Sequence, residues 1–247
     1  MSAFLETPQG RHIAYNRTEG RAPGVVFLGG LVSDMTGTKA THLEAWARAE
    51  GRAFLRFDYS GHGESSERFE DGCVGDWAED AREAITTLTD GPQVLVGSSM
   101  GGWIALLLAR AIPERIAAIV GIGAAPDFTE DSMWAEASDE QRAQLMNEGF
   151  FIEPSDYSDE GYIVTRRMIE DGRHNLVLRA PLSLPFPVRL LHGTADTDVP
   201  VAVGLRLMEH ADCADLRLTL VKGADHRFST PECLDLITDT IATLPGT

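Results

Sequence analysis

The pentapeptide Gly97-Ser98-Ser99-Met100-Gly101 combines a nucleophilic residue type with the space that its chemistry needs. It follows an apolar run that predicts a strand ending at Val96, and it precedes a helical pattern. A serine at such a turn has a strained backbone that lifts its hydroxyl above the sheet, and only glycine fits two residues before and after it. Ser98 fails this requirement because Val96 and Met100 occupy those positions. The pattern therefore predicts Ser99 as the nucleophile.

A serine hydroxyl needs a neighbouring base, usually a histidine that a carboxylate holds in one tautomer. The loop 192–200 follows a buried apolar run and places Asp196 at the carboxyl edge of the predicted sheet. The loop 223–226 follows the last predicted strand and places His226 at the same edge. The order Ser99, Asp196, His226 is that of a known class of serine hydrolases. We predict that these three residues form a catalytic triad.

Other acids and histidines are alternatives to these assignments. Asp198 is the nearest alternative to Asp196, although it suits a cap for the helix that begins near Pro200. Asp127, after the preceding strand, is a more distant alternative. His192 stands at a strand end and suits a structural hydrogen bond. The other histidines suit surface positions: His12, His42, His174 and His210.

Attack on an acyl group places negative charge on its oxygen, so two backbone N–H groups are expected to point at that position. Met100 N–H, directly after the nucleophile, is the first candidate. Leu31 N–H is the second, because it lies in the loop after the first central strand, where Gly29 and Gly30 let the backbone approach a substrate closely. An ordinary strand-to-helix turn would also explain the two glycines.

The elements that position these residues follow an alternating β and α pattern, which indicates an α/β fold with a mostly parallel, twisted sheet and helices on both faces. Segments 4–6 and 12–16 predict an antiparallel hairpin at one edge. Central strands are expected at 25–28, 54–57, 94–96, 116–122, 188–191 and 216–221. Helices are expected at about 38–50, 74–89, 99–111, 200–211 and 231–244.

The stretch from Asp127 to about Pro185 differs from the rest, with acidic helical patterns and no plausible sheet strand. We therefore predict a core formed by residues 1–126 and 186–247, interrupted by a small helical cap at 127–185. Apolar residues of this cap could line an acyl pocket, although core packing is the more common role of such residues: Met133, Trp134, Phe150, Phe151, Ile152 and Tyr157.

Composition excludes several classes of protein. The chain has 247 residues and 43% hydrophobic content, which suits one sizeable core. Its net charge of −17 repels phosphate backbones and anionic lipids, so neither nucleic acid nor a membrane surface is an expected partner. No apolar run is long enough to span a membrane. Three scattered cysteines predict reduced thiols, and with no visible leader sequence we expect a cytoplasmic protein.

These motifs together resemble the α/β-hydrolase superfamily. At finer grain the chain is similar to its mitochondrial palmitoyl-protein thioesterases, also called mycophenolic acid acyl-glucuronide esterases. The residues that carry this similarity are Asp34–Ala40, Arg56–Gly61, Val96–Trp103, Leu190–Gly193 and Asp225–Arg227. The chain departs from that group at its N-terminus, without a visible transit peptide, and in the cap, which is less alike.

The resemblance implies hydrolysis of acyl thioesters or carboxylic esters, with no cofactor and no metal. The substrate would be a small molecule or an S-acylated protein. It also implies that the segment 58–65 supports the site, with His62 in a structural role. Arg166 and Arg167 could hold a substrate carboxylate such as a glucuronate, although a solvated pair with nearby acids is the commoner arrangement. The candidates for substrate contact are Trp103, Trp134, Phe150, Arg166 and Arg167.

Two further readings stay open at this stage. A metal-free haloperoxidase or perhydrolase, or a carbon–carbon bond hydrolase, would use the same three residues. A catalytically silent binding module would use the same pocket without activating its serine. Dehalogenase and epoxide hydrolase chemistry is disfavoured because it would need an aspartate at the position of Ser99.

Overall fold

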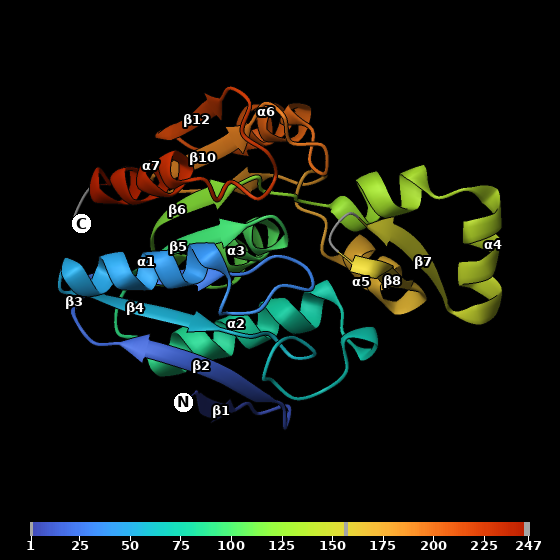
Figure 1. The fold of residues 1–247 in the computed structure, drawn as a ribbon, viewed down its shortest axis with the longest axis horizontal. Helices are drawn as coiled ribbons and strands as arrows, with labels where there is room; N and C mark the ends of the chain where they lie inside the picture. The colour runs from blue at the N-terminus through green and yellow to red at the C-terminus, as the bar shows by residue number, and fades with distance from the viewer. Residues whose placement is uncertain (1, 156–157, 245–247) are drawn as a thin grey trace.

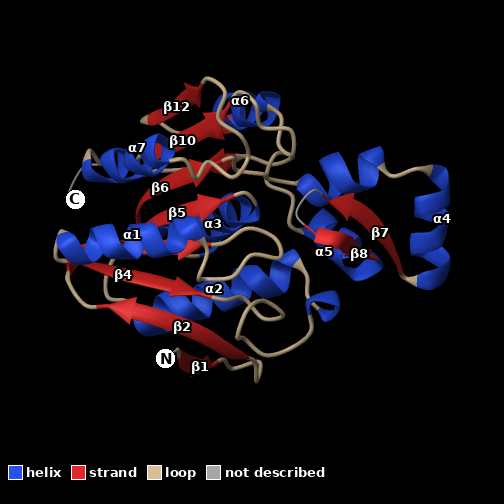
Figure 2. Cartoon of the chain, viewed as in Figure 1, coloured by secondary structure: helices blue, strands red, loops and turns tan. Residues whose placement is uncertain are grey.

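The computed structural model describes residues 2–155 and 158–244 and contains an eight-stranded sheet with a cap beside it (Figures 1 and 2). The strand order is β1-β2-β4-β3-β5-β6-β10-β12, with β1, β2 and β4 paired antiparallel and the rest parallel. The strands are β1 (Ala3–Glu6), β2 (His12–Thr18), β3 (Arg21–Leu28), β4 (Arg52–Phe57), β5 (Gln93–Ser98), β6 (Ile116–Ile122), β10 (Val188–Gly193) and β12 (Leu216–Val221).

Helices cover both faces of this sheet because the side chains of each central strand alternate between two cores. On β3, Val25 and Phe27 pack into one core, while Val26 and Leu28 pack into the other. The first core is covered by α1 (Thr38–Ala49) and α7 (Pro231–Ala242). The second is covered by α2 (Val74–Leu88), α3 (Met100–Ala111) and α6 (Val201–His210). The predicted α/β fold is confirmed, and each predicted core strand and helix is present in the structure.

The cap contains the expected helices, but it also contains a β-hairpin, so the expectation that this stretch holds no strand is wrong. A π-helical turn, Thr129–Trp134, leads to α4 (Asp139–Glu148), the antiparallel strands β7 (Phe150–Ser155) and β8 (Ser158–Thr165), and α5 (Arg166–His174). On β7, Phe151 is buried while its neighbours are exposed, which is the alternation of a half-buried strand. The segment Phe150–Ile152 is too short for this alternation of buried and exposed residues to be recognised in the sequence without the partner strand β8. Tyr157, predicted to face the pocket, lies outside the described residues.

The two connections between cap and core are held together at Asp127. This buried carboxylate accepts hydrogen bonds from Val177 N at 2.8 Å and Leu178 N at 3.0 Å, and pairs with Arg179 at 2.6 Å. Just beyond, β9 (Leu182–Ser183) pairs with β11 (Ala211–Asp212), although β9 falls inside the predicted insertion. The cap therefore leaves and re-enters the core at neighbouring points (Figure 1).

Candidate active site

Ser99 occupies the sharp turn between β5 and α3. Its backbone has φ 53° and ψ −118°, a conformation that strains a residue with a side chain, and Ser99 N donates to Ile122 O at 2.9 Å. A Cβ atom on Gly97 would lie 2.3 Å from Gly101 O, and one on Gly101 would lie 2.1 Å from Leu28 O. Strand and helix are thus packed so closely around the turn that no side chain fits at either glycine.

His226 and Asp196 approach Ser99 from two separate loops at the carboxyl edge of the sheet. His226 Nε2 lies 3.1 Å from Ser99 Oγ, and His226 Nδ1 lies 2.8 Å from Asp196 Oδ2. Since the ionised carboxylate can only accept, Nδ1 carries the ring proton and Nε2 accepts from the serine hydroxyl. The side chain of Asp196 is 1% exposed and that of His226 is 16% exposed, so the histidine is open to the cavity while its acid is covered.

The carboxylate of Asp196 is held ionised by its neighbours. Its burial works to raise the pKa, but hydrogen bonds from His226 and from Val199 N hold the pKa below its ordinary value. Asp198 N donates to Asp196 Oδ1 at 3.0 Å and Val199 N at 2.8 Å, so the second oxygen is fixed by the loop's own backbone. Asp196 therefore orients the imidazole as a fixed negative charge.

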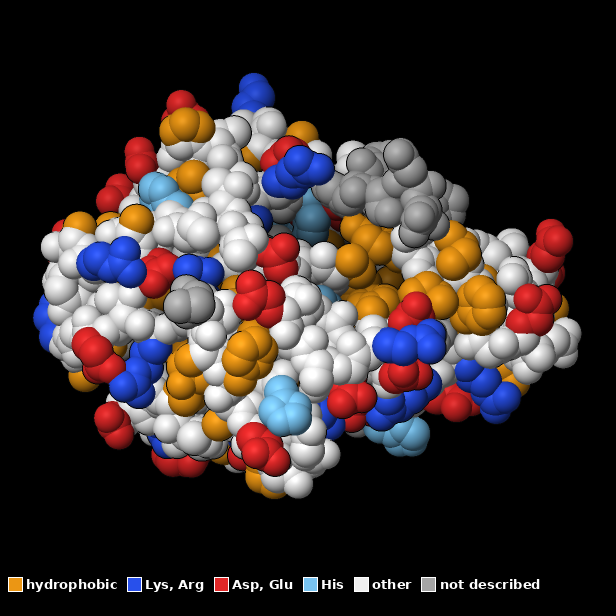
Figure 3. All heavy atoms as spheres, turned by 60° about the horizontal axis from the view of Figure 1, so that its bottom comes forward, with side chains coloured by type: hydrophobic (Ala, Val, Ile, Leu, Met, Phe, Trp, Pro, Cys, Tyr) orange, Lys and Arg blue, Asp and Glu red, His pale blue; other side chains and the backbone are white. Residues whose placement is uncertain are grey.

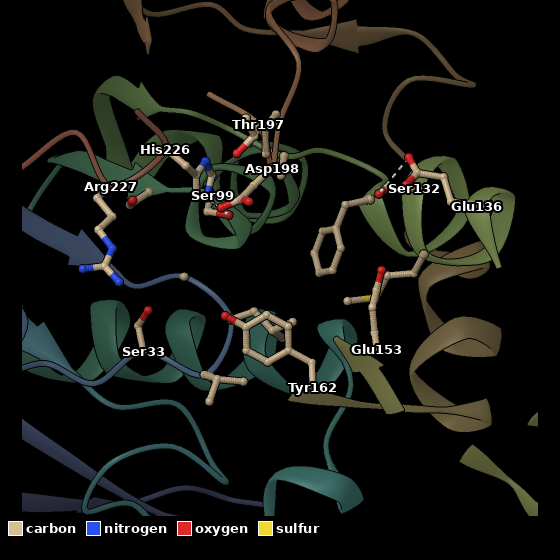
Figure 4. Close-up of a pocket in the computed structure, with 18 of the residues that line it drawn as sticks. Ser33, Ser99, Ser132, Glu136, Glu153, Tyr162, Thr197, Asp198, His226 and Arg227 are labelled. Atoms are coloured by element: carbon tan, nitrogen blue, oxygen red, sulfur yellow. Dashed lines mark hydrogen bonds between the residues drawn. The ribbon is translucent and has the colours of Figure 1, made fainter. Parts of the chain in front are cut away.

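The structure places the alternative residues elsewhere. His192 Nε2 donates to Val199 O at 2.8 Å and lies 3.6 Å from the Asp196 carboxylate, with the imidazole buried below the loop. Asp198 donates its backbone N–H to Asp196 Oδ1 and lines the cavity beside Ser99 (Figure 4). Asp127 holds the cap connections as described above. His210 bonds Ala180 O at 2.8 Å, far along α6.

The loop after β3 brings backbone against the nucleophile. A Cβ on Gly30 would lie 3.4 Å from Ser99 Cβ, so the Gly30–Leu31 backbone runs directly beside the serine. Met100 is the first residue of α3, and an N–H at that position has no partner within its own helix. The N–H groups of Leu31 and Met100 thus lie on the two segments that flank Ser99, where a substrate oxygen could be received.

His62 supports this loop from below. Its Nδ1 lies 3.1 Å from Ser60 O, a group that can only accept, so Nε2 is unprotonated and accepts a hydrogen bond from Val32 N at 3.2 Å. Val32 has φ 55°, a strained value for a β-branched residue. Burial lowers the pKa of His62, against a smaller opposing effect of Ser60 O, which favours the neutral ring that this arrangement requires.

A cavity of about 670 Å³ opens above Ser99 between core and cap (Figure 4). The core contributes Leu31 and His226, and the cap contributes Phe128, Met133 and Tyr162. In Figure 3 hydrophobic side chains gather in the hollow between the two lobes, with histidine at its edge. The pocket can therefore hold an apolar group next to the serine.

None of the five residues predicted to contact substrate lines this cavity. Trp103 is fully buried on α3, where its Nε1 donates to Asn175 O at 3.1 Å. Trp134 stacks against Arg142 and Arg173, with their guanidinium carbons 5.3 and 4.7 Å from the ring. Trp103 thus links the core to the cap, and Trp134 packs within the cap.

The other three predicted contacts also lie outside the lining of the cavity. Phe150, the first residue of β7, is 38% exposed. Arg166 pairs with Glu170 at 2.6 Å, four residues along the same helix, and Arg167 pairs with Asp76 of α2 at 2.7 Å. The predicted carboxylate contact of these arginines is not supported, because helix geometry and α2 provide them with acids of their own.

Sequence reasoning missed several residues that line the cavity. Lys39 follows the first residue of α1, and Arg227 follows His226 directly. Arg227 directly follows the predicted base, which could have indicated that it lies near the site, but the direction of its side chain depends on the fold. Glu136, Glu153 and Tyr162 come from the cap, whose hairpin was not foreseen.

Within the part of the chain that the structure describes, no group of three or more metal-binding side chains is found, and the three cysteines are free thiols. None of the described helices has the length and apolar character to cross a membrane. The chemistry on offer is a serine hydroxyl hydrogen-bonded to an imidazole that a buried carboxylate orients. Such a set can transfer an acyl group to the serine.

Comparison with known proteins places this geometry in context. The family described as the alpha/beta hydrolase fold matches residues 25–149. The mitochondrial palmitoyl-protein thioesterases ABHD10 of Bos taurus and Homo sapiens are each 36% identical to the chain over 240 residues, covering 97% of this chain and 78% of theirs.

Solved structures agree with the sequence relatives. A putative hydrolase from Agrobacterium vitis S4 matches with a TM-score of 0.94 and 39% identity, covering 98% of this chain and 97% of the other. Mouse alpha/beta hydrolase domain-containing protein 10 matches with a TM-score of 0.91 and 34% identity, with the same coverage of both chains. The similarity therefore extends through the cap as well as the core.

Proposed function

The chain belongs to the α/β-hydrolase family, and from this premise we propose that it is a serine hydrolase that cleaves acyl thioesters or carboxylic esters through an acyl-serine intermediate. The single observation that carries the proposal is the unbroken hydrogen-bond chain from Ser99 Oγ through His226 to Asp196. Relatives named palmitoyl-protein thioesterase, similar over nearly the whole chain, support an acyl substrate.

In the first half of the reaction, Ser99 Oγ attacks the acyl carbon while His226 Nε2 takes the hydroxyl proton. Negative charge develops on the acyl oxygen, which receives the N–H groups of Leu31 and Met100. The intermediate collapses, the bond to the leaving sulfur or oxygen breaks, and His226 returns the proton to that atom. The products at this stage are an acyl-serine and a free thiol or alcohol.

Water completes the cycle in the second half. His226 removes a proton from a water molecule that attacks the acyl-serine, and the tetrahedral species collapses to release a carboxylic acid and the free serine. Asp196, whose pKa lies below its ordinary value, stays ionised and stabilises the imidazolium formed in each half. No metal or cofactor enters either half of this scheme.

Labelling with a fluorophosphonate probe tests whether the serine is activated. We expect covalent labelling of the protein at Ser99, loss of the label in Ser99→Ala, and retention of the label at Ser99 in Ser98→Ala, which removes the adjacent hydroxyl. Turnover by Ser99→Ala is expected to fall by several orders of magnitude. Failure of the unmodified protein to label would favour a silent binding module and refute the proposal.

A panel of nitrophenyl esters, acyl-CoA and S-acyl peptides, compared by kcat/KM, then defines the acyl group and the leaving group. A protein that labels at Ser99 but cleaves no member of this panel would redirect the proposal to perhydrolysis or carbon–carbon bond hydrolysis. Residence in the cytoplasm stays a prediction, since the relatives reported above carry the word mitochondrial in their names.

A further inference from the structure

Helix α2 carries a charged residue on its buried face. Its apolar residues, among them Val74, Trp77 and Ala81, pack into the core, and Asp80 lies between them with 0% of its surface exposed. A buried carboxylate lowers stability unless other groups replace its lost hydration. Asp80 belongs neither to the triad nor to the lining of the cavity. Its role must therefore be sought in the groups that it binds.

The groups that bind Asp80 are hydrogen-bond donors. Oδ1 accepts from Arg11 Nε at 2.6 Å, and Oδ2 accepts from Ser60 N at 2.9 Å and from Ser60 Oγ at 2.6 Å. Burial raises the pKa of Asp80, against the opposing effects of the Ser60 hydrogen bonds and the Arg11 charge. Since an ionised carboxylate can only accept, the charged form suits all three donors. Asp80 thus binds two atoms of Ser60 while Arg11 neutralises its charge.

Ser60 connects Asp80 to His62. Trp77, which precedes Asp80 on α2, donates from Nε1 to Ser60 O at 3.0 Å. The same carbonyl oxygen lies 3.1 Å from His62 Nδ1 and accepts its proton in a second hydrogen bond. Helix α2 therefore holds the N, Oγ and O atoms of Ser60. With this carbonyl fixed, the ring proton of His62 stays on Nδ1 and Nε2 is left as an acceptor.

The connection ends at the loop beside Ser99. His62 Nε2 accepts from Val32 N at 3.2 Å, and Val32 directly follows Leu31, one of the two N–H donors in the proposed reaction. The φ of Val32, 55°, is costly for a β-branched residue, so the loop keeps this conformation only while its contacts hold it. The position of Leu31 therefore depends on contacts that begin on α2.

We propose that Asp80 is a positioning residue for the proposed reaction. Through Ser60 and His62, it holds the loop whose Leu31 N–H receives the acyl oxygen. This inference rests on the proposed serine hydrolase function. A donor stabilises the developing charge best when it is already in place, because moving it during the reaction costs energy. Loss of Asp80 should therefore lower kcat and leave KM nearly unchanged.

A second attachment of the same loop limits the size of this effect. Met35 N donates to Asp58 Oδ1 at 2.6 Å, beyond Val32 along the loop. Loss of Asp80 should therefore loosen the loop at Val32 without releasing it. Complete removal of an oxyanion donor lowers kcat by about 10²–10³-fold, so we expect a smaller loss, about fivefold, in Asp80→Ala.

A double-mutant cycle with His62→Phe tests the connection. The measurements are kcat and KM for nitrophenyl butyrate, with urea unfolding to show that each variant is folded in the assay. We expect kcat to fall about fivefold in Asp80→Ala and about tenfold in His62→Phe, with KM within about twofold of its original value. The variant with both substitutions should match His62→Phe, because both changes act on the bond to Val32 N, whereas independent effects would multiply to about fiftyfold.

Milder variants keep the test decisive if Asp80→Ala does not fold. Ser60→Ala removes only the hydrogen bond from Oγ to Asp80, and Asp80→Asn keeps one oxygen for Ser60. We expect each to lower kcat about threefold, and to have no further effect when His62→Phe is already present. Asp171→Asn is the matched control, because this carboxylate holds α2 at a different place, accepting from Gly75 N at 2.8 Å. Its kcat should stay within about 1.5-fold of that of the unmodified protein.

The possible failures can be told apart. An unchanged kcat in folded Asp80→Asn and Ser60→Ala would overturn the inference. An equal fold-loss from the Asp80 substitution with and without His62→Phe would also overturn it, since Asp80 would then act by another route. In either case, labelling at Ser99 and turnover by the unmodified protein leave the proposed function intact. If the unmodified protein neither labels nor cleaves the ester, the proposed function fails and this inference fails with it.

Discussion

Replacing His62 with phenylalanine isolates the support that this residue gives to the loop beside Ser99. The phenyl ring preserves the edge-to-face packing of the imidazole on Tyr59, Phe69 and Trp77, whose ring centroids lie 5.7, 5.4 and 5.1 Å away. What it removes are two hydrogen bonds, one to Ser60 O and one from Val32 N.

The expected loss of unfolding free energy depends on which hydrogen bonds Ser60 O and Val32 N keep after the substitution. Ser60 O retains the hydrogen bond from Trp77 Nε1 at 3.0 Å, so this carbonyl stays satisfied. Val32 N loses its acceptor, a change that costs about 1–3 kcal/mol when the group stays dry. Because Val32 is 52% exposed and lines the cavity, water can reach its N–H, and we expect a loss of unfolding free energy near about 1 kcal/mol.

Activity should be more sensitive than stability. Complete loss of one oxyanion donor lowers kcat by about 10²–10³-fold in other serine hydrolases, and a donor that is loosened rather than removed should cost less, about tenfold. The assay is kcat and KM for a nitrophenyl butyrate, together with urea unfolding. We expect kcat to fall while KM changes little, since the Leu31 N–H acts mainly on the charged intermediate.

Tyr59→Phe is the matched control from the same aromatic cluster. Its hydroxyl donates to Gly29 O at 3.4 Å, a long and weak hydrogen bond, so its loss should change kcat and stability by less than about twofold and 0.5 kcal/mol. A kcat for His62→Phe equal to that of Tyr59→Phe would refute the argument that Nε2 of His62 positions this loop.

Two further predictions concern the turn and the cap. Gly101→Ala places a Cβ 2.1 Å from Leu28 O, a backbone atom that cannot move aside, so it should lower the free energy of unfolding in urea by about 3 kcal/mol or more. The control is Gly37→Ala, whose Cβ would lie 3.5 Å from Asp34 O and should lower it by less than about 0.5 kcal/mol. Asp127→Asn leaves at least one buried backbone N–H without an acceptor and should lower the unfolding free energy by about 1–3 kcal/mol; unchanged stability would contradict its role at the cap connections.

Local patterns identified most of the core because each signal lies within a few neighbouring residues. The buried runs at Val25–Leu28 and Ile116–Ile122 correspond to β3 and β6, and the helical spacing over 74–89 corresponds to α2. In the cap the sequence was misleading, because the period of two at Phe150–Ile152 is visible only when the partner strand β8 is paired with it.

For the site, the sequence by itself determined which residue types stand at strand ends, and this was enough to select Ser99, Asp196 and His226. The carboxyl ends of parallel strands share one edge, so position along the chain translates directly into position in space. Only the tertiary structure decided which side chains surround them. Lys39 at the start of α1, Ser33 in the loop before it and Arg227 after His226 line one cavity only because of packing across the whole molecule. Arg166 pairs with Glu170 four residues along its own helix, as the spacing allows, whereas no local pattern reveals the bond from Trp103 to the carbonyl of Asn175.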